Sequence, residues 1–85
     1  MAKYSILIKP SAVKEIEDIQ RKDRIRIIQK IRDLADTPRP PGCEKLAAEN
    51  RYRIRHGVYR IVYSISDKEL HVIVVRVGHR REIYK

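Results

Sequence analysis

The stretch that decides the fold is residues 51–65, which read RYRIRHGVYRIVYSI. Its first half alternates three arginines with Tyr52 and Ile54, and a period of two places the two sets on opposite faces of a β-strand. His56-Gly57 supplies turn chemistry, and residues 58–65 then alternate again. The stretch therefore predicts a β-hairpin with one basic face and one apolar face. On its second strand we expect Tyr59, Ile61, Tyr63 and Ile65 to share the apolar face, and Val58, Arg60, Val62 and Ser64 to share the other.

The residues on either side of this hairpin complete one small domain. Residues 4–9 form a β-prone run that Pro10 ends, and residues 70–77 form an apolar run typical of an interior strand. Apolar residues recur at helical spacing in residues 12–19 and 27–35, separated by a charged junction. We expect these two segments to be helices, with Ser11 and Asp23 as their N-caps and Thr37-Pro38 as the stop of the second.

The element order is therefore β-α-α-β-β-β over residues 1–85. The simplest way to bury both helical stripes is an α+β fold in which a helical hairpin packs on one face of a mostly antiparallel, four-stranded sheet. The proline-rich residues 38–42 form a stiff crossing segment within this one domain, since neither side could fold alone.

Charge is the strongest compositional signal. Twenty Lys and Arg against eleven Asp and Glu give a formal net charge of +9 and a sequence pI of about 10.1. Residues 51–85 hold seven arginines and two lysines against three acids, so most of the excess lies in the last part of the chain. Such a patch indicates a polyanionic partner, although a basic surface kept for solubility is the alternative.

Several kinds of chemistry find no support in the sequence. One cysteine, Cys43, cannot form an intramolecular disulfide, and no Cys/His cluster has zinc spacing. No glycine-rich phosphate loop or nucleophile elbow is present, so we expect no metal and no cofactor. The apolar runs are far shorter than the roughly 20 residues that span a bilayer. With no signal-peptide pattern in the first ten residues, we expect a cytoplasmic protein without a membrane partner.

What remains is a set of arginines that neighbouring strands can bring together. Arg53 and Arg55 point the same way, Arg60 interrupts an otherwise apolar strand, and Arg80 follows the last strand. Cleavage of RNA by its own 2′-hydroxyl needs such cations, because negative charge gathers on the phosphorane in the transition state. A tyrosine could stack on a base and hold it in line, and we consider Tyr84 first. For the tyrosines inside the strands, packing in the core is the alternative.

Two motifs resemble a known family. The segment YRIRHGVYRIVY, residues 52–63, is similar to the core of RelE/ParE-type bacterial toxins, and VGHRREIY, residues 77–84, resembles the end of the RelE branch. Lys45-Leu46 resembles a pair that precedes the basic strand in that family. The resemblance covers the whole chain. It implies a toxin that binds in the ribosomal A site, cleaves the exposed mRNA codon and is neutralised by a RelB-like antitoxin that wraps it. Operator DNA would be bound only by the toxin–antitoxin complex.

The resemblance also assigns roles to residues. The family's basic and aromatic site positions match Arg53, Arg55, Arg60, Arg80 and Tyr84. The family has lysines where Arg53 and Arg55 stand, and one of those lysines is proposed as the base. Arginine, with a pKa above about 12, is a poor base. His79 and His56 therefore become candidates for proton transfer, with a turn role as the alternative for each. Further candidates for RNA contact are Lys45, Arg51, Arg81 and Lys85.

Two other readings stay open. One is a ParE-like toxin that poisons DNA gyrase on the same scaffold without cutting nucleic acid. The other is a basic RNA- or DNA-binding module without activity, which would bind with strong salt dependence and release no cleavage product.

Overall fold

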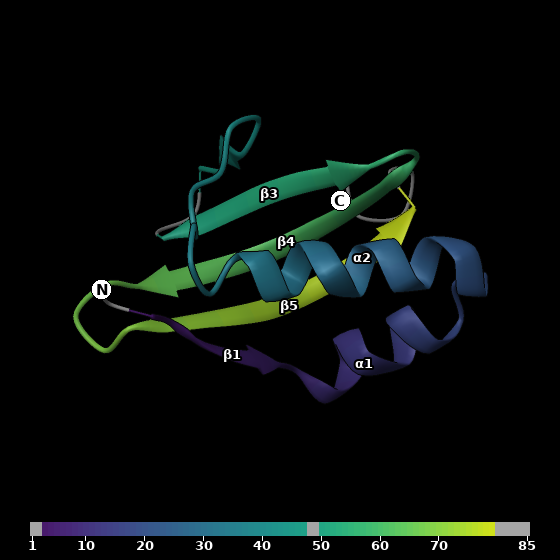
Figure 1. Ribbon diagram of the computed structural model, residues 1–85, viewed down its shortest axis with the longest axis horizontal. Helices are drawn as coiled ribbons and strands as arrows, with labels where there is room; N and C mark the ends of the chain where they lie inside the picture. Colours follow the sequence, from purple (N-terminus) through teal and green to yellow (C-terminus); the bar gives the residue numbers. More distant parts are fainter. Residues whose placement is uncertain (1–2, 48–49, 80–85) are drawn as a thin grey trace.

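The computed structural model describes residues 3–47 and 50–79 and arranges them as two helices and a five-stranded sheet (Figure 1). The elements in chain order are β1 (Ser5–Ile8), α1 (Pro10–Glu17), α2 (Arg21–Asp33), β2 (Glu44–Lys45), β3 (Arg51–His56), β4 (Tyr59–Ser66) and β5 (His71–His79).

The sheet has the strand order β1-β5-β4-β3-β2. β1 runs parallel to β5, and the other three pairings are antiparallel. The predicted α+β class, helical hairpin and mostly antiparallel sheet are confirmed. The predicted strand count is too low by one, because β2 has only two residues, too few to leave a period in the sequence.

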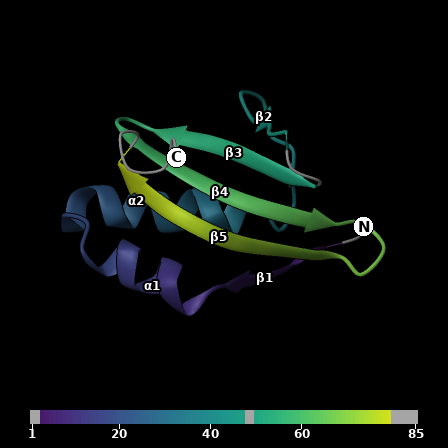
Figure 2. The same cartoon turned by 180° about the vertical axis from the view of Figure 1, so that it is seen from behind.

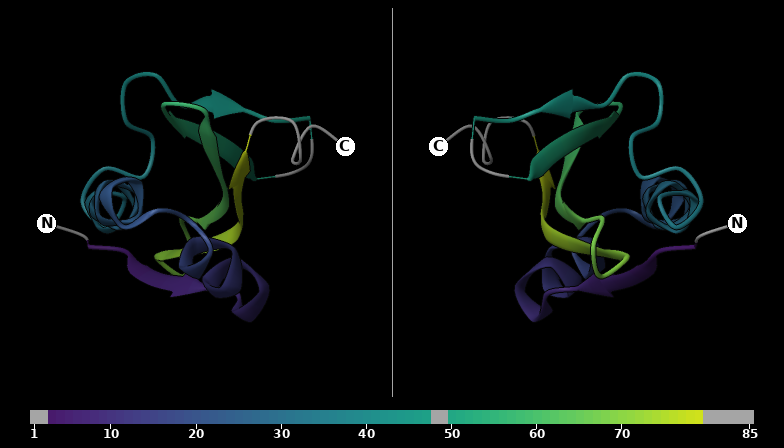
Figure 3. Two further views of the ribbon diagram at one scale, coloured as in Figure 1. Left: turned by 90° about the vertical axis from the view of Figure 1, so that its right-hand side faces the viewer. Right: turned by 90° about the vertical axis from the view of Figure 1, so that its left-hand side faces the viewer.

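Both helices lie on one face of the sheet, whereas the view from behind looks directly onto β3, β4 and β5 (Figures 1 and 2). Seen along the sheet, the two helices lie on the same side of the curved strands (Figure 3). The core fills the space between these two layers. Its fully buried side chains of largest volume are Tyr63, Ile27, Leu34, Ile61, Val72, Val74 and Val77.

A register shift in β5 decides which of its side chains reach the core. Val62 pairs with Arg76 but Tyr63 pairs with Val74, so Val75 is an extra residue that changes the alternation. Val72 and Val74 lie in the core before the shift, and Val77 lies in it afterwards. The prediction of an interior strand that is apolar on both faces is confirmed, since β5 lies between β1 and β4.

The predicted turn between β3 and β4 is confirmed, but the predicted helix N-caps are not. Gly57 has a φ of +58° at the first position of a two-residue turn, the position where type II′ hairpins require glycine. The predicted N-caps were wrong. α1 begins at Pro10 with Lys9 as its cap, because proline suits the first helical position, where its fixed φ is already helical and it leaves no N–H unsatisfied. The cap of α2 is Gln20, and Asp23 instead lies in the first turn and contacts His56.

The crossing segment between α2 and the sheet is tied down by Arg39. Its guanidinium makes two hydrogen bonds to the Asp67 carboxylate, at 3.2 and 2.8 Å, and donates a third to the Tyr52 hydroxyl. Tyr4 donates to the same carboxylate at 2.6 Å. These contacts connect the start of the chain, the crossing segment and the β4–β5 turn.

Candidate nucleic-acid interface

The arginines of β3 lie on the face of the sheet that points away from the helices. Tyr52 and Ile54 are buried in the core, so the alternating Arg51, Arg53 and Arg55 point the other way. Arg60 on β4 is the cross-strand partner of Arg55, and partners in an antiparallel pair share a face. The described part of the chain therefore brings four of the sequence candidates, Arg51, Arg53, Arg55 and Arg60, onto one surface, which we call the arginine face.

Arg60 occupies the most enclosed position of this set. Its exposed fraction is 3%, and it is the one buried charged residue in the described ranges. On its other side it pairs with Gly78 of β5, which has no side chain to compete for the space above the sheet. A guanidinium in such surroundings interacts more strongly with an anion than it would in water.

The sequence analysis missed one member of this surface, Glu44 on β2. The pairing of β2 with β3 places Glu44 opposite Arg53. Its two carboxylate oxygens each lie 3.1 Å from a guanidinium nitrogen, one of Arg53 and one of Arg55. Hydrogen bonding and charge from Arg53, and charge from Arg55 and Arg60, lower the pKa of Glu44. The guanidiniums of Arg53 and Arg55 thus already hold one carboxylate, as an anion-binding surface would.

The two histidine candidates lie on the other side of the sheet. His56 and His79 are both cross-strand partners of Tyr59, which packs against the core beneath the helices. His56 Nε2 is 3.2 Å from the Asp23 carboxylate of α2, and the His79 ring meets the Tyr59 ring edge to face at 6.3 Å. The structure therefore does not bring either histidine together with the arginine face.

The strand tyrosines serve packing. Tyr52 and Tyr63 are buried and stack at 6.0 Å between ring centroids, and the Tyr63 hydroxyl donates to the Pro38 carbonyl at 2.7 Å. Burial raises the pKa of Tyr63 well above its usual value, so this phenol stays protonated. For these two rings the alternative of core packing is the correct one.

Of the remaining candidates, Lys45 lies away from the arginine face and the other four fall outside the described residues. Lys45 is exposed on β2 and pairs with Tyr52, so it does not share the arginine face. Arg80, Arg81, Tyr84 and Lys85 lie outside the described residues, and their places in a site stay predictions.

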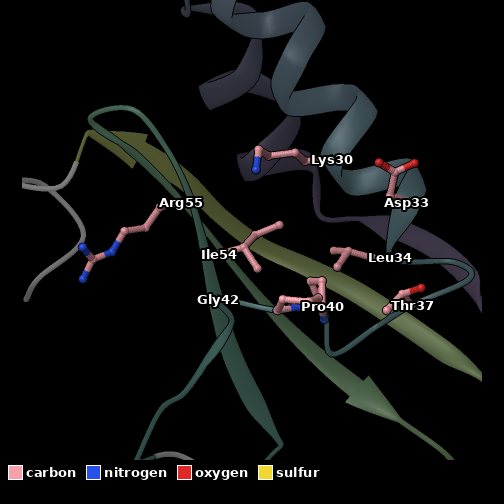
Figure 4. Close-up of a pocket in the computed structure, with 9 residues that line it drawn as sticks. Lys30, Asp33, Leu34, Thr37, Pro40, Gly42, Ile54 and Arg55 are labelled. Atoms are coloured by element: carbon pink, nitrogen blue, oxygen red, sulfur yellow. The ribbon is translucent and has the colours of Figure 1, made fainter.

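A hollow of about 330 Å³ lies between the end of α2, the crossing segment and β3, with Lys30, Leu34 and Ile54 in its wall. Arg55 borders it, but its guanidinium points away from the helix and toward the arginine face (Figure 4). This hollow is therefore separate from the basic surface. Within residues 3–47 and 50–79, no group of His, Cys, Asp and Glu is arranged to hold a metal ion, and neither helix is long and apolar enough to cross a membrane.

The fold and the arginine face together define a small α+β domain with a basic sheet surface. A family model described as the ParE toxin of the type II toxin–antitoxin system parDE matches residues 6–84. A curated RelE-like toxin protein of Escherichia coli is 26% identical over 80 residues, which are 92% of this chain and 84% of the relative. Toxin RelG of Mycobacterium tuberculosis is 41% identical over 34 residues, 40% of this chain and 39% of that protein.

Solved structures agree with these relatives. A mutant of the E. coli toxin RelE in the free state superposes with a TM-score of 0.80 at 26% identity, covering 98% of this chain and 88% of that one. RelE in the RelE–RelB complex from Pyrococcus horikoshii gives a TM-score of 0.83 at 24% identity, covering 92% and 96%. The chain belongs to the ParE toxin family of type II toxin–antitoxin systems, and within the RelE/ParE superfamily it is RelE-like.

Proposed function

We propose that this protein is a metal-independent endoribonuclease that cleaves mRNA codons in the ribosomal A site and thereby inhibits translation in the cytoplasm. The observation that supports this most directly is the arginine face, where Arg53, Arg55 and Arg60 share one surface and the first two already hold the Glu44 carboxylate. A site built from cations suits a reaction whose nucleophile belongs to the substrate.

In the proposed reaction the 2′-hydroxyl of the codon attacks the adjacent phosphorus, and the 5′-oxygen of the next nucleotide leaves. Arg60, together with Arg53 and Arg55, would neutralise the charge on the phosphorane, and each fixed donor of this kind is worth about 10²–10³ in rate. We also propose that Arg80 adds a further cation, that Tyr84 stacks on a base to hold the codon in line, and that Arg51, Arg81 and Lys85 contact the RNA backbone.

The positions of the histidines bear on proton transfer. His56 and His79 lie on the helix side of the sheet, so in this arrangement neither reaches a phosphate on the arginine face. The proposal therefore assigns the rate enhancement mainly to charge stabilisation and alignment, with proton transfer left to groups that the ribosome or water can supply.

The test is toeprinting on ribosomes programmed with a defined mRNA, with and without EDTA. We expect a cut within the A-site codon that EDTA does not suppress and that leaves a 2′,3′-cyclic phosphate or its hydrolysis product. Arg60→Ala should slow the cut by about 10²-fold or more while the protein stays folded. Intact mRNA on programmed ribosomes at micromolar wild-type protein would refute the proposal.

A second candidate function follows from the matching family model, which is that of the ParE toxin. On this reading the protein would poison DNA gyrase without cutting nucleic acid. Induction in cells, followed by pulse labelling, separates the two candidates. Incorporation of amino acids stops first for a ribosome-dependent nuclease, whereas incorporation of thymidine stops first for a gyrase poison.

We further propose that an antitoxin neutralises the protein, and that operator DNA is bound only by the toxin–antitoxin complex. The P. horikoshii RelE was solved together with RelB, and the same fold occurs here. A formal net charge of +9 also favours an acidic partner segment, because opposite charge speeds and orients association.

A further inference from the structure

We propose that the Glu44 carboxylate is a built-in competitor for RNA phosphate, which occupies the Arg53 and Arg55 guanidiniums in the free protein and gives way when a phosphodiester binds. This inference rests on the proposed function, since it concerns how the same arginines receive RNA.

The geometry of Glu44 is that of a bound anion. Its Oε2 lies 3.1 Å from Nη2 of Arg53, and its Oε1 lies 3.1 Å from Nη2 of Arg55. A phosphodiester also offers two oxygens to two guanidinium groups, and arginine recognises carboxylate and phosphate through the same planar set of donors. Glu44 and an RNA phosphate would therefore use the same donors.

The contact is open enough to be exchanged. The Glu44 side chain is 46% exposed and the Arg55 side chain is 53% exposed, whereas the Arg53 side chain is 15% exposed. β2 is a two-residue edge strand, so few backbone contacts hold Glu44 in place. The exposed pair with Arg55 contributes little stability, so a ligand with more charge can draw Glu44 away from it.

The competitor is present throughout the physiological pH range. The neighbouring arginines lower the pKa of Glu44, so its carboxylate stays ionised at neutral pH. While it remains in place, it offsets part of the repulsion among clustered guanidiniums and weakens their attraction for a single phosphate. Free RNA would therefore bind less tightly than the charge of the chain suggests, whereas RNA presented in an ordered site could still displace the carboxylate.

The experiment compares wild type with Glu44→Gln, which keeps the side-chain shape and removes the charge. The probe is a fluorescent six-nucleotide 2′-O-methyl RNA, which cannot be cleaved, titrated at low salt and followed by anisotropy. Removing one charge a few ångströms from the phosphate should tighten binding by roughly three- to tenfold. The matched control is Glu69→Gln in the exposed β4–β5 turn, which makes the same change in net charge and should alter the Kd by less than about twofold.

A double-mutant cycle separates competition for the arginines from simple repulsion. In an Arg55→Ala background the gain from Glu44→Gln should shrink, because one of the contested guanidiniums is gone. Unchanged or weaker binding by Glu44→Gln, or an equal gain in Glu69→Gln, would overturn the inference while leaving the nuclease proposal intact. Absence of oligonucleotide binding in every variant would likewise overturn the inference, whereas the nuclease proposal is decided separately by toeprinting on programmed ribosomes.

Discussion

Arg60→Met is the most informative single perturbation of the arginine face. Methionine has a long, unbranched stem, so it can fill the space that Arg60 occupies between its partners Arg55 and Gly78, while it removes the positive charge. Arg60 is 3% exposed, so its guanidinium would act on a bound phosphate with little screening by water. We expect codon cleavage to slow by about 10²-fold, or about 2.7 kcal/mol of transition-state stabilisation.

The assay follows cleaved mRNA over time by toeprinting at saturating ribosomes, next to a thermal melt of each variant. The melting temperature should change by less than about 4 °C, which corresponds to roughly 1 kcal/mol or less in a domain of this size. Arg26→Met is the matched control, because Arg26 is exposed on α2 and its loss changes the net charge equally. A wild-type cleavage rate in Arg60→Met, or an equal loss in both variants, would show that the reasoning from the arginine face is mistaken.

Three further predictions concern the scaffold. Ile27→Ala removes a fully buried α2 side chain and should lower the free energy of unfolding by about 2–5 kcal/mol, which urea denaturation measures; a cost below about 1 kcal/mol would contradict the described packing. Gly57→Ala places a Cβ at a φ of +58° and should cost about 1 kcal/mol, also by urea denaturation, whereas an unchanged midpoint would mean that the turn relaxes. The hydrogen bond from Arg39 is the main cause that lowers the pKa of Asp67 in the folded protein below its ordinary value of 3.8. The ionised Asp67 therefore stabilises the fold fully above pH 3.8, and this stabilisation is lost as the pH falls through the pKa of the folded protein. Asp67→Asn should therefore melt below wild type at pH 7, and the gap should close in acid; a gap that persists at pH 2 would rule out this ionisation as its source.

The hairpin and the helices could be predicted because each leaves a period in the sequence. Alternation in residues 51–65 fixes both the strands and the face on which the arginines lie. β2 leaves no such trace, since two residues cannot repeat a pattern, and Glu44 was missed with it. The contacts of Glu44 with Arg53 and Arg55 depend on the pairing of β2 with β3, which no pattern in the sequence indicates.

The histidines illustrate two different failures of sequence reasoning. His56 follows Tyr52 and Ile54 at a spacing of two residues, so the alternation already indicated that its side chain lies on the helix side of the sheet. In a regular continuation of β5, the His79 side chain would lie on the face of the sheet away from the helices, because Val72 and Val74 face the core. The extra residue Val75 reverses that alternation, and only the observed register reveals it.

The same extra residue also governs which side chains a shift in strand pairing would bring into the core. If Val75 instead took the place opposite Val62 and the pairing continued without a shift, Arg76 would stand opposite Ile61 under the helices and Val77 opposite Arg60. The Arg76 guanidinium would then enter the apolar core, and the Val77 side chain would crowd Arg60, the most enclosed cation. Loss of Val75 itself would leave Arg76 opposite Val62 and Val77 opposite Ile61, so relatives of this chain should tolerate its exchange or loss far better than a one-residue shift of Arg76 and Val77.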